Sequence, residues 1–303
     1  MYDLIIVKNS KKKRIIEIII LVIFVIVATI GGIKLANYTN MKKQQLALQK
    51  QQEQEKQLLL EKQKQEEEAK QRNIKKHKSQ TSRPLTDAEK DRIHHIYTSE
   101  EKRVFLTFDD GPTQNVTPLI LDLLNKENIK ATFFVLGNNA RNNKDIIKRE
   151  FNEGHYIANH GYSHKYSAVY ASPEATLEEY NTTEQAIKDA LEDQSYSSKL
   201  FRFPGGSNGG YYDEIKQASK ALLRENGVVH LDWNCLSKDA EGAKTKETLL
   251  QNAIDTMQGK NSVVILMHDS SDKILTYEML PELISYLREQ GYKFENIYDL
   301  LDD

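Results

Sequence analysis

From residue 103 onward, short apolar runs alternate with segments whose apolar residues recur at helical spacing. The runs are rich in β-branched and aromatic residues and occupy residues 103–109, 131–137, 156–160, 200–206, 228–234, 262–269 and 292–297. The segments between them predict helices at 117–127, 172–192, 212–226, 246–257 and 282–290. Strands that alternate with helices form mainly parallel sheets. We therefore predict an α/β fold, best matched by a distorted, incomplete (β/α) barrel, with an open doubly wound sheet as the alternative.

Two adjacent aspartates, Asp109 and Asp110, end the first run, in the sequence TFDDGPT at 107–113. Successive side chains of a strand point to opposite faces, so the two carboxylates can converge only if the strand ends there. Gly111-Pro112 is a turn signal that allows this. Adjacent carboxylates repel, which favours a cation or a shared proton beside them. Taken alone, the stretch also fits a polar turn that caps the next helix.

Two histidines four residues apart, His160 and His164, follow the third run. At this spacing they can share one face of a helical turn and hold one metal ion. With a carboxylate from the aspartate pair they make a three-ligand set, which leaves zinc an open position for water or substrate. The same set suits Fe(II). The second carboxylate, free to act as a base, favours hydrolysis.

The later runs also end in polar or glycine residues. Arg202 alternates with two phenylalanines, and an arginine facing the barrel interior must pair with an acid, for which Asp109 is the obvious partner. Gly205 and Gly206 allow the backbone to approach a ligand closely. All of these residues lie at the carboxyl ends of predicted strands, where such folds build their active sites.

The fifth and sixth runs end in DWN at 232–234 and LMHD at 266–269. An aspartate paired with His268 would raise the pKa of the histidine and fix its tautomer, as a general acid requires. Trp233 and Leu266 are candidates for the wall of a pocket. The remaining nearby residues are interpreted as loop or core residues without a site role: Asp239, Asp269, Asp272 and Cys235.

The amino-terminal third has a different composition. We predict a cytoplasmic basic segment at 1–14, a single transmembrane anchor at 15–36, a polar spacer rich in Gln, Glu and Lys at 37–84 and a lead-in at 85–102, before a catalytic domain at 103–303. About 20 apolar residues span a bilayer, and the basic residues 11–14 keep the amino terminus inside. The catalytic domain would then be extracellular. Residues 41–80 of the spacer lack Gly and Pro, which permits a helix, but they lack the heptads of a coiled coil. The His94-His95 pair is interpreted as surface residues.

The overall charge gives no reason to expect a nucleic-acid partner, because the formal net charge is −2. No protein partner is implied either. A single cysteine excludes an intrachain disulfide, so stability must come from the core or from a metal.

In their order along the chain, five short motifs resemble those of the polysaccharide deacetylase family, carbohydrate esterase family four. They lie at 107–113, 160–164, 202–205, 232–233 and 266–268. The resemblance implies a deformed (β/α) barrel and metal-dependent removal of acetyl groups from glycans. The anchor and spacer are most similar to those of Gram-positive peptidoglycan N-acetylglucosamine deacetylases, which implies a cell-wall glycan substrate and a wall that lysozyme cleaves poorly.

The family resemblance also implies a role for each matching residue. Asp109 would be the catalytic base, oriented by Arg202, and Asp232 would support His268 as the general acid. Asp110, His160 and His164 would hold a divalent metal, Zn²⁺ or alternatively Co²⁺. Gly205 would supply a backbone amide to the oxyanion, while Trp233 and Leu266 would contact substrate. Many relatives have tyrosine where this chain has Gly205, so substrate contacts there are expected to differ.

Two other functions were weighed against deacetylation. A glycosidase needs two carboxyl groups about 5–10 Å apart, which adjacent aspartates do not naturally provide. A non-catalytic glycan-binding wall protein would be expected to lack the base or the acid, and both Asp109 and His268 are present.

Overall fold

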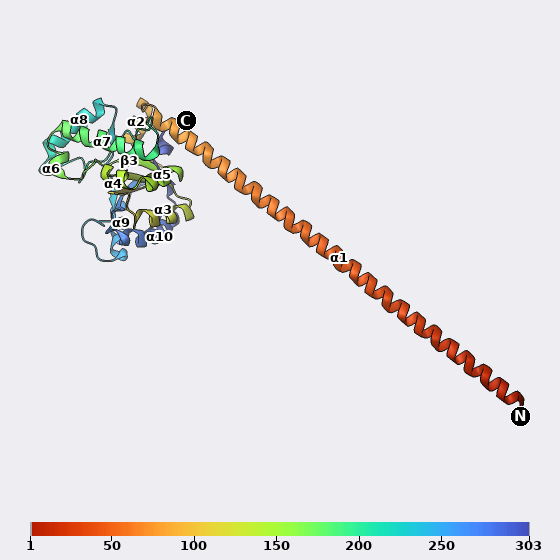
Figure 1. Ribbon diagram of the computed structural model, residues 1–303. Coiled ribbons are helices and arrows are strands. Elements are labelled where there is room, and N and C mark those ends of the chain that lie inside the picture. Colours follow the sequence, from red (N-terminus) through yellow and green to blue (C-terminus); the bar gives the residue numbers. More distant parts are fainter. Residues whose placement is uncertain (1, 303) are drawn as a thin grey trace. The chain divides into compact units, whose positions relative to one another are not determined.

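A computed structural model describes residues 2–302 of the chain (Figure 1). The chain divides into two compact units, residues 1–69 and residues 70–303. A continuous helix, α1 (Tyr2–Ser82), runs through the first unit and ends inside the second. The second unit therefore extends further toward the amino terminus than the predicted catalytic domain.

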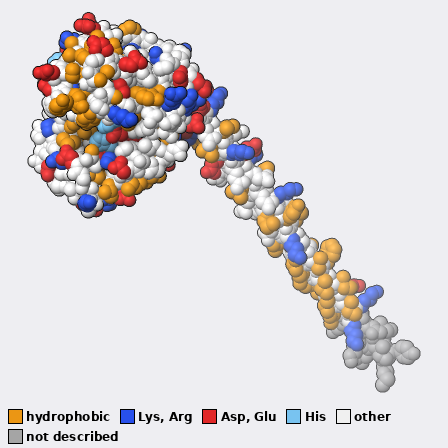
Figure 2. All heavy atoms as spheres, turned by 60° about the vertical axis from the view of Figure 1, so that its left-hand side comes forward, with side chains coloured by type: hydrophobic (Ala, Val, Ile, Leu, Met, Phe, Trp, Pro, Cys, Tyr) orange, Lys and Arg blue, Asp and Glu red, His pale blue; other side chains and the backbone are white. Residues whose placement is uncertain are grey.

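In the first unit, α1 presents its apolar side chains to the outside. Figure 2 shows hydrophobic side chains covering one stretch of this helix, and those from Ile15 to Leu35 are exposed. Among the described residues, one helix is long and apolar enough to cross a membrane, and it is this one. The polar segment after it is helical, as its lack of Gly and Pro permits.

The last turns of α1 belong to the second unit and pack against the rest of it. The Gln80 side chain is buried, and its amide donates hydrogen bonds to three backbone carbonyls, those of Tyr298, Leu301 and Asp302. The Lys199 ammonium donates to the carbonyl of Thr81 over 2.8 Å, and the His77 ring stacks on Tyr298 at 3.7 Å. A short helix, α2 (Asp87–His94), follows and begins with a capping box formed by Thr86 and Glu89.

The core of the second unit is a sheet of eight parallel strands. Their order is β5-β4-β3-β2-β1-β7-β6, with β8 pairing with β1. The strands are β1 (Arg103–Asp109), β2 (Thr132–Val135), β3 (Tyr156–Asn159), β4 (Leu200–Phe201), β5 (Val229–His230), β6 (Cys235–Leu236), β7 (Ser262–His268) and β8 (Lys293–Glu295). Among the described residues, the two end strands β5 and β6 do not pair with each other. The curled sheet therefore does not close and forms a half-barrel.

The helices form an outer layer over the sheet (Figure 1). Neighbouring helices in this layer contact one another in the order α9, α10, α3, α5, α7 and α8. This order runs from the β6 end of the sheet to the β5 end. Their bounds are α3 (Thr117–Lys126), α4 (Gly137–Asn142), α5 (Lys144–Asn152), α6 (Tyr166–Val169), α7 (Pro173–Leu191), α8 (Asp213–Glu225), α9 (Lys246–Met257), α10 (Ile274–Glu289) and the 3-10 turn η1 (Ile297–Leu300). Apolar residues of β1 and β7 fill the space between the layers.

The incomplete barrel is confirmed, with several differences in detail. All seven predicted strands are present, most of them shorter than predicted, and β6 is an additional strand. The last long helix begins at Ile274 and not at residue 282, because Pro281 lies inside the helix and does not end it. Four short helices were not predicted: α2 lies in the stretch interpreted as a lead-in, α4 and α6 have too few turns to give a periodic pattern, and α5 is a short helix that begins two residues after the end of α4.

Strand register brings the polar residues to one edge. Asp109, the last residue of β1, pairs with Phe134 of β2 and with His268 of β7. Paired residues of parallel strands point to the same face, so Asp109 and His268 are neighbours on one side of the sheet.

We predict that Gln80→Ala lowers the free energy of unfolding by about 1–3 kcal/mol, because three carbonyls each lose the hydrogen bond that they accept from the Gln80 amide. Thermal or urea unfolding of a protein that lacks residues 1–40 measures the change. Gln57→Ala, an exposed position on the same helix, is the matched control. Equal midpoints for the two variants would contradict the docking of α1.

Candidate active site

A tight turn carries the aspartate pair away from β1. Asp109 is buried, and Asp110 has a φ of 75°, in the left-handed region that few non-glycine residues adopt. Gly111 is required here, because a Cβ atom at this position would lie 2.0 Å from Oδ2 of Asp269. Asn139 of α4 donates to the carbonyl of Asp110 over 2.7 Å and holds the turn. The turn predicted from Gly111-Pro112 is therefore present.

His160 and His164 lie on the loop between β3 and α6, not on one face of a helical turn as predicted. Gly161 has a φ of 81° and His164 a φ of 55°, and these two left-handed residues bend the loop so that both rings face Asp110. Glu179 of α7 holds the loop, since its carboxylate accepts hydrogen bonds from the backbone amides of Tyr162 and Ser163.

Asp110, His160 and His164 form a cluster with the geometry of a metal site. One candidate ligand atom from each residue lies within 4.8 Å of the others. Oδ1 of Asp110 is 3.6 Å from Nε2 of His160 and 3.4 Å from Nε2 of His164, yet this buried oxygen accepts no hydrogen bond in the described part of the chain. An unpaired buried carboxylate oxygen is costly unless a cation neutralises it.

The histidine chemistry fits a metal in the same way. Nδ1 of His160 lies 2.8 Å from the carbonyl of Arg202, which makes Nδ1 the protonated nitrogen and leaves the Nε2 lone pair facing the cluster. Burial lowers the pKa of His160 to about 3, so the ring is neutral. Two imidazoles and a carboxylate are donors that zinc accepts, and the residues therefore fit the predicted ion.

Arg202 and Asp109 form a fully buried ion pair. Nη1 of Arg202 donates to Oδ1 of Asp109 over 2.8 Å, as the strand alternation predicted, and also to the Thr107 hydroxyl. Burial raises the pKa of Asp109, and the charge of Arg202 opposes that rise. The other carboxylate oxygen, Oδ2, is 3.7 Å from Nε2 of His160, so Asp109 borders the metal cluster without belonging to it.

His268 is paired with Asp239 and not with Asp232, which corrects the sequence prediction. Nδ1 of His268 lies 2.8 Å from Oδ1 of Asp239, whose other oxygen accepts from the backbone amide of His268 and from the Thr276 hydroxyl. Burial lowers the pKa of His268, but the hydrogen bond and charge of Asp239 outweigh it and raise the pKa to about 9. Asp239 lies in the loop after β6, a strand too short to recognise in the sequence.

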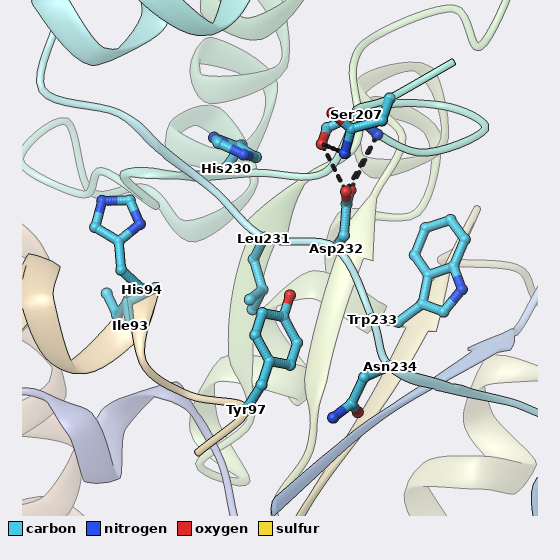
Figure 3. A pocket seen from close by; sticks show the side chains of 10 residues that line it. Ile93, His94, Tyr97, Ser207, His230, Leu231, Asp232, Trp233 and Asn234 are labelled. Carbon is cyan, nitrogen blue, oxygen red and sulfur yellow. Dashed lines mark hydrogen bonds between the residues drawn. The ribbon is translucent and has the colours of Figure 1, made fainter. Parts of the chain in front are cut away.

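Asp232 instead holds the loop after β4. Figure 3 shows its carboxylate directed at Ser207, whose backbone amide donates to Oδ1 over 3.1 Å and whose hydroxyl donates to Oδ2 over 2.6 Å. Asp232 and Trp233 line a cavity of about 360 Å³ together with residues of the lead-in and of β5. A Cβ atom on Gly206 would lie 3.3 Å from the Trp233 ring, so this loop packs closely against the indole.

The other expected substrate contacts surround the same edge. Gly205 is exposed and has a φ of 73°, a conformation that glycine adopts without strain. Leu266 is buried on β7, in register with Thr107 of β1. Its position two residues before His268 puts its side chain on the same face of the strand.

Asp269 has a structural function that the sequence did not indicate. Its side chain is fully buried, accepts from the Thr117 hydroxyl over 2.5 Å and fills the space beside Gly111. Burial raises its pKa to about 7. Cys235 is buried, as predicted, and burial raises the pKa of its thiol to about 11. His94 and His95 are both exposed.

Three supporting residues, Asn139, Glu179 and Asp239, were missed. Each lies outside the strand-end motifs and reaches the site from a helix or a loop that is distant in sequence. A carboxylate on a predicted helix, such as Glu179, gives no local signal that separates it from a solvated side chain.

Comparison with known proteins agrees with this geometry. The family model described as polysaccharide deacetylase matches residues 97–225. YheN of Bacillus subtilis, named as a candidate polysaccharide deacetylase, is 34% identical over 217 residues, which are 69% of this chain and 73% of YheN. The peptidoglycan-N-acetylglucosamine deacetylase PgdA of Listeria monocytogenes is 32% identical over 203 residues. That match covers 66% of this chain and 39% of the Listeria enzyme's own length.

Solved structures give the same result. A carbohydrate esterase family four enzyme from Streptococcus mutans superposes with a TM-score of 0.62 and 33% identity, covering 70% of this chain and 92% of that one. The catalytic domain of a peptidoglycan N-acetylglucosamine deacetylase from Eubacterium rectale gives a TM-score of 0.60 and 31% identity, covering 66% and 90%. The chain therefore belongs to the polysaccharide deacetylase family and is a hydrolase of that class.

Proposed function

We propose that this protein is a zinc-dependent deacetylase that removes N-acetyl groups from N-acetylglucosamine in cell-wall peptidoglycan and releases acetate. The observation that carries the proposal is the unpaired Oδ1 of Asp110 between two imidazoles, with a separate buried carboxylate, Asp109, beside them. Peptidoglycan is favoured because the relatives from Listeria and Eubacterium carry that substrate in their names.

Another acetylated glycan is the second candidate substrate. A bifunctional xylanase/deacetylase of Pseudobutyrivibrio xylanivorans is 31% identical over 207 residues, and an esterase domain of a multidomain xylanase has a TM-score of 0.56. Chitooligosaccharide, poly-N-acetylglucosamine and acetylated xylan therefore belong in the same assay as peptidoglycan. A non-catalytic wall protein is disfavoured by the presence of both the base and the acid.

The metal ion would be held by Asp110, His160 and His164. Zinc is the first choice for a set of two nitrogens and one oxygen, and Co²⁺ is an alternative. When bound, the ion would polarise the acetyl carbonyl and lower the pKa of a water molecule.

Asp109 would accept a proton from the attacking water. The charge of Arg202 opposes the rise in the pKa of Asp109 that burial causes, and its hydrogen bond fixes Oδ1, so that Oδ2 is the oxygen left to face the cluster. The backbone amide of Gly205 would donate to the developing oxyanion. Asp232 would act as a positioning residue, because it binds Ser207 in the loop that carries this amide.

His268 would protonate the leaving amine through Nε2, since Nδ1 is hydrogen-bonded to Asp239. A pKa raised to about 9 keeps the ring protonated at neutral pH, which a general acid needs. Leu266 and Trp233 would surround the acetyl methyl group. The products are a free amine and acetate.

The amino-terminal segment would keep the enzyme at the cell membrane. The apolar stretch of α1 would be a single-pass anchor, and the helical spacer would carry an extracellular catalytic unit toward the wall. Deacetylation would leave cationic glucosamine in the wall, which would then resist lysozyme.

We predict that Asp109→Asn keeps zinc but loses about 10²–10⁴-fold in the rate of acetate release, since one acid–base group is removed. His160→Ala is expected to lose both zinc and activity. Metal analysis of the purified proteins and an acetate assay on peptidoglycan, chitooligosaccharide and acetylated xylan measure these effects. Full activity of Asp109→Asn, or of the chelator-treated wild type, would exclude the mechanism.

We also predict that Asp239 and Asp232 have separable effects on the pH profile. The His268 acid is active when protonated, so kcat/KM falls as the pH rises through its pKa. Asp239→Asn removes the charge that raises this pKa and should move the alkaline limb down by about one pH unit or more. Asp232→Asn is the matched control and should leave the limb in place while lowering the maximum rate. Equal limbs in Asp239→Asn and wild type would contradict the Asp239 assignment.

A further inference from the structure

Tyr166 occupies the space that a side chain at residue 205 would fill. It is the first residue of α6, two residues after His164. A Cβ atom on Gly205 would lie 2.4 Å from the Tyr166 hydroxyl oxygen and 3.1 Å from its ring carbon Cζ. Both distances are shorter than van der Waals contact, so a side chain at residue 205 would require the Tyr166 ring to move from the position that it occupies.

The ring of Tyr166 also borders the metal cluster. Its centroid is 5.7 Å from that of His164, and it makes edge-on ring contacts with Tyr170 and Tyr212 at centroid distances of 5.7 and 6.5 Å. Tyr170 is itself fixed, because its hydroxyl donates to the carbonyl of Pro204 over 2.7 Å. The ring of Tyr166 is thus supported from behind by aromatic neighbours and next to the proposed metal ligands.

The hydroxyl group of Tyr166 has no hydrogen-bond partner within residues 2–302, and 41% of the residue is exposed. A phenol can donate one hydrogen bond and accept others, and its ring offers an apolar face. The aromatic neighbours of Tyr166 do not occupy its hydroxyl group or the exposed part of its ring, so both can contact a ligand at the metal cluster. A sugar ring matches them, because it has an apolar C–H face and a rim of hydroxyl groups.

We propose that Tyr166 is a substrate-positioning residue that contacts the reacting sugar from the α6 side of the site, in place of any side chain at residue 205. This inference rests on the proposed function, because it takes an acetylated glycan as the ligand. It also gives a reason for the glycine at residue 205, whose own amide is the proposed oxyanion donor: a residue without a side chain leaves room for the Tyr166 ring at the start of α6.

Kinetics on a soluble N-acetylglucosamine oligomer test the positioning role. Tyr166→Ala should raise KM about tenfold and change kcat less than about threefold, and Tyr166→Phe should raise KM about two- to fivefold, because it loses only the hydroxyl group. Zinc content should be unchanged in both. Tyr286→Phe, on the far half of α10, is the matched control. An unchanged KM in Tyr166→Ala would overturn the proposal.

A double-mutant cycle tests the geometry without any activity. Gly205→Ala is strained by the positive φ in every background, but it meets the Tyr166 hydroxyl only when that ring is present. Its effect on the thermal unfolding midpoint should therefore be larger in the wild type than in Tyr166→Ala. The same loss in both backgrounds would show that the ring does not lie over Gly205, which would also overturn the proposal.

Failure of the proposed function can be told apart from failure of this inference. If the wild type releases no acetate from any of the glycans tested, the deacetylase assignment fails. Calorimetric titration of the zinc-loaded wild type and Tyr166→Ala with the same oligomer then decides the Tyr166 role. Weaker binding by Tyr166→Ala supports it, and equal binding, or no binding by either protein, overturns it.

Discussion

The buried guanidinium of Arg202 is the interaction on which the arrangement of the site depends. From the end of β4 it bonds to Asp109 and Thr107 of β1 and to the carbonyls of Leu231 and Asp232 after β5, while its plane lies 3.8 Å from the Phe134 ring of β2. A buried charge costs several kcal/mol unless its partners are complete. The carboxylate and three other oxygen acceptors meet that requirement, so the carboxyl ends of four strands are fixed by one side chain.

Beside this charge pair, the proposed metal ligands are held in backbone conformations that cost free energy. Asp110 and His164 both have positive φ values, which cost about 1–3 kcal/mol each. Hydrogen bonds from Asn139 and to Glu179 offset that cost from outside the site. These hydrogen bonds hold the three candidate ligand atoms together, although His160 and His164 lie on a loop. Such preorganisation is what a site needs if its carboxylate is to remain unpaired.

Local pattern predicted the fold and the members of the site, but not all of their partners. Strand alternation was sufficient for Arg202 and Asp109, because an inward arginine at a sheet edge needs an acid and the end of β1 offered one. The partner of His268 could not be found in this way. Asp232 and Asp239 both follow β5 in the sequence. Which of them reaches His268 depends on β6, a strand of two residues that pairs with β7 and so brings Asp239 to the end of β7. The helical interpretation of the histidine pair was wrong because a spacing of four residues is also compatible with a loop. Gly161 was the one local indication of a loop.

Asp232 and Asp239 support different parts of the site from the two ends of the half-barrel. Asp239 comes from the β6 side and fixes the acid His268, whereas Asp232 comes from the β5 side and fixes the loop of Gly205. Because β5 and β6 do not pair, these two halves of the site are connected mainly through β1 and Arg202. The residues proposed for chemistry lie on the strand ends or are bonded to them. By contrast, the Tyr166 ring, at the start of α6, lies against the backbone of Gly205, in the loop after β4. Changes in these two segments can therefore alter which glycan fits without disturbing the proton transfers, and this is where members of one fold can differ in substrate.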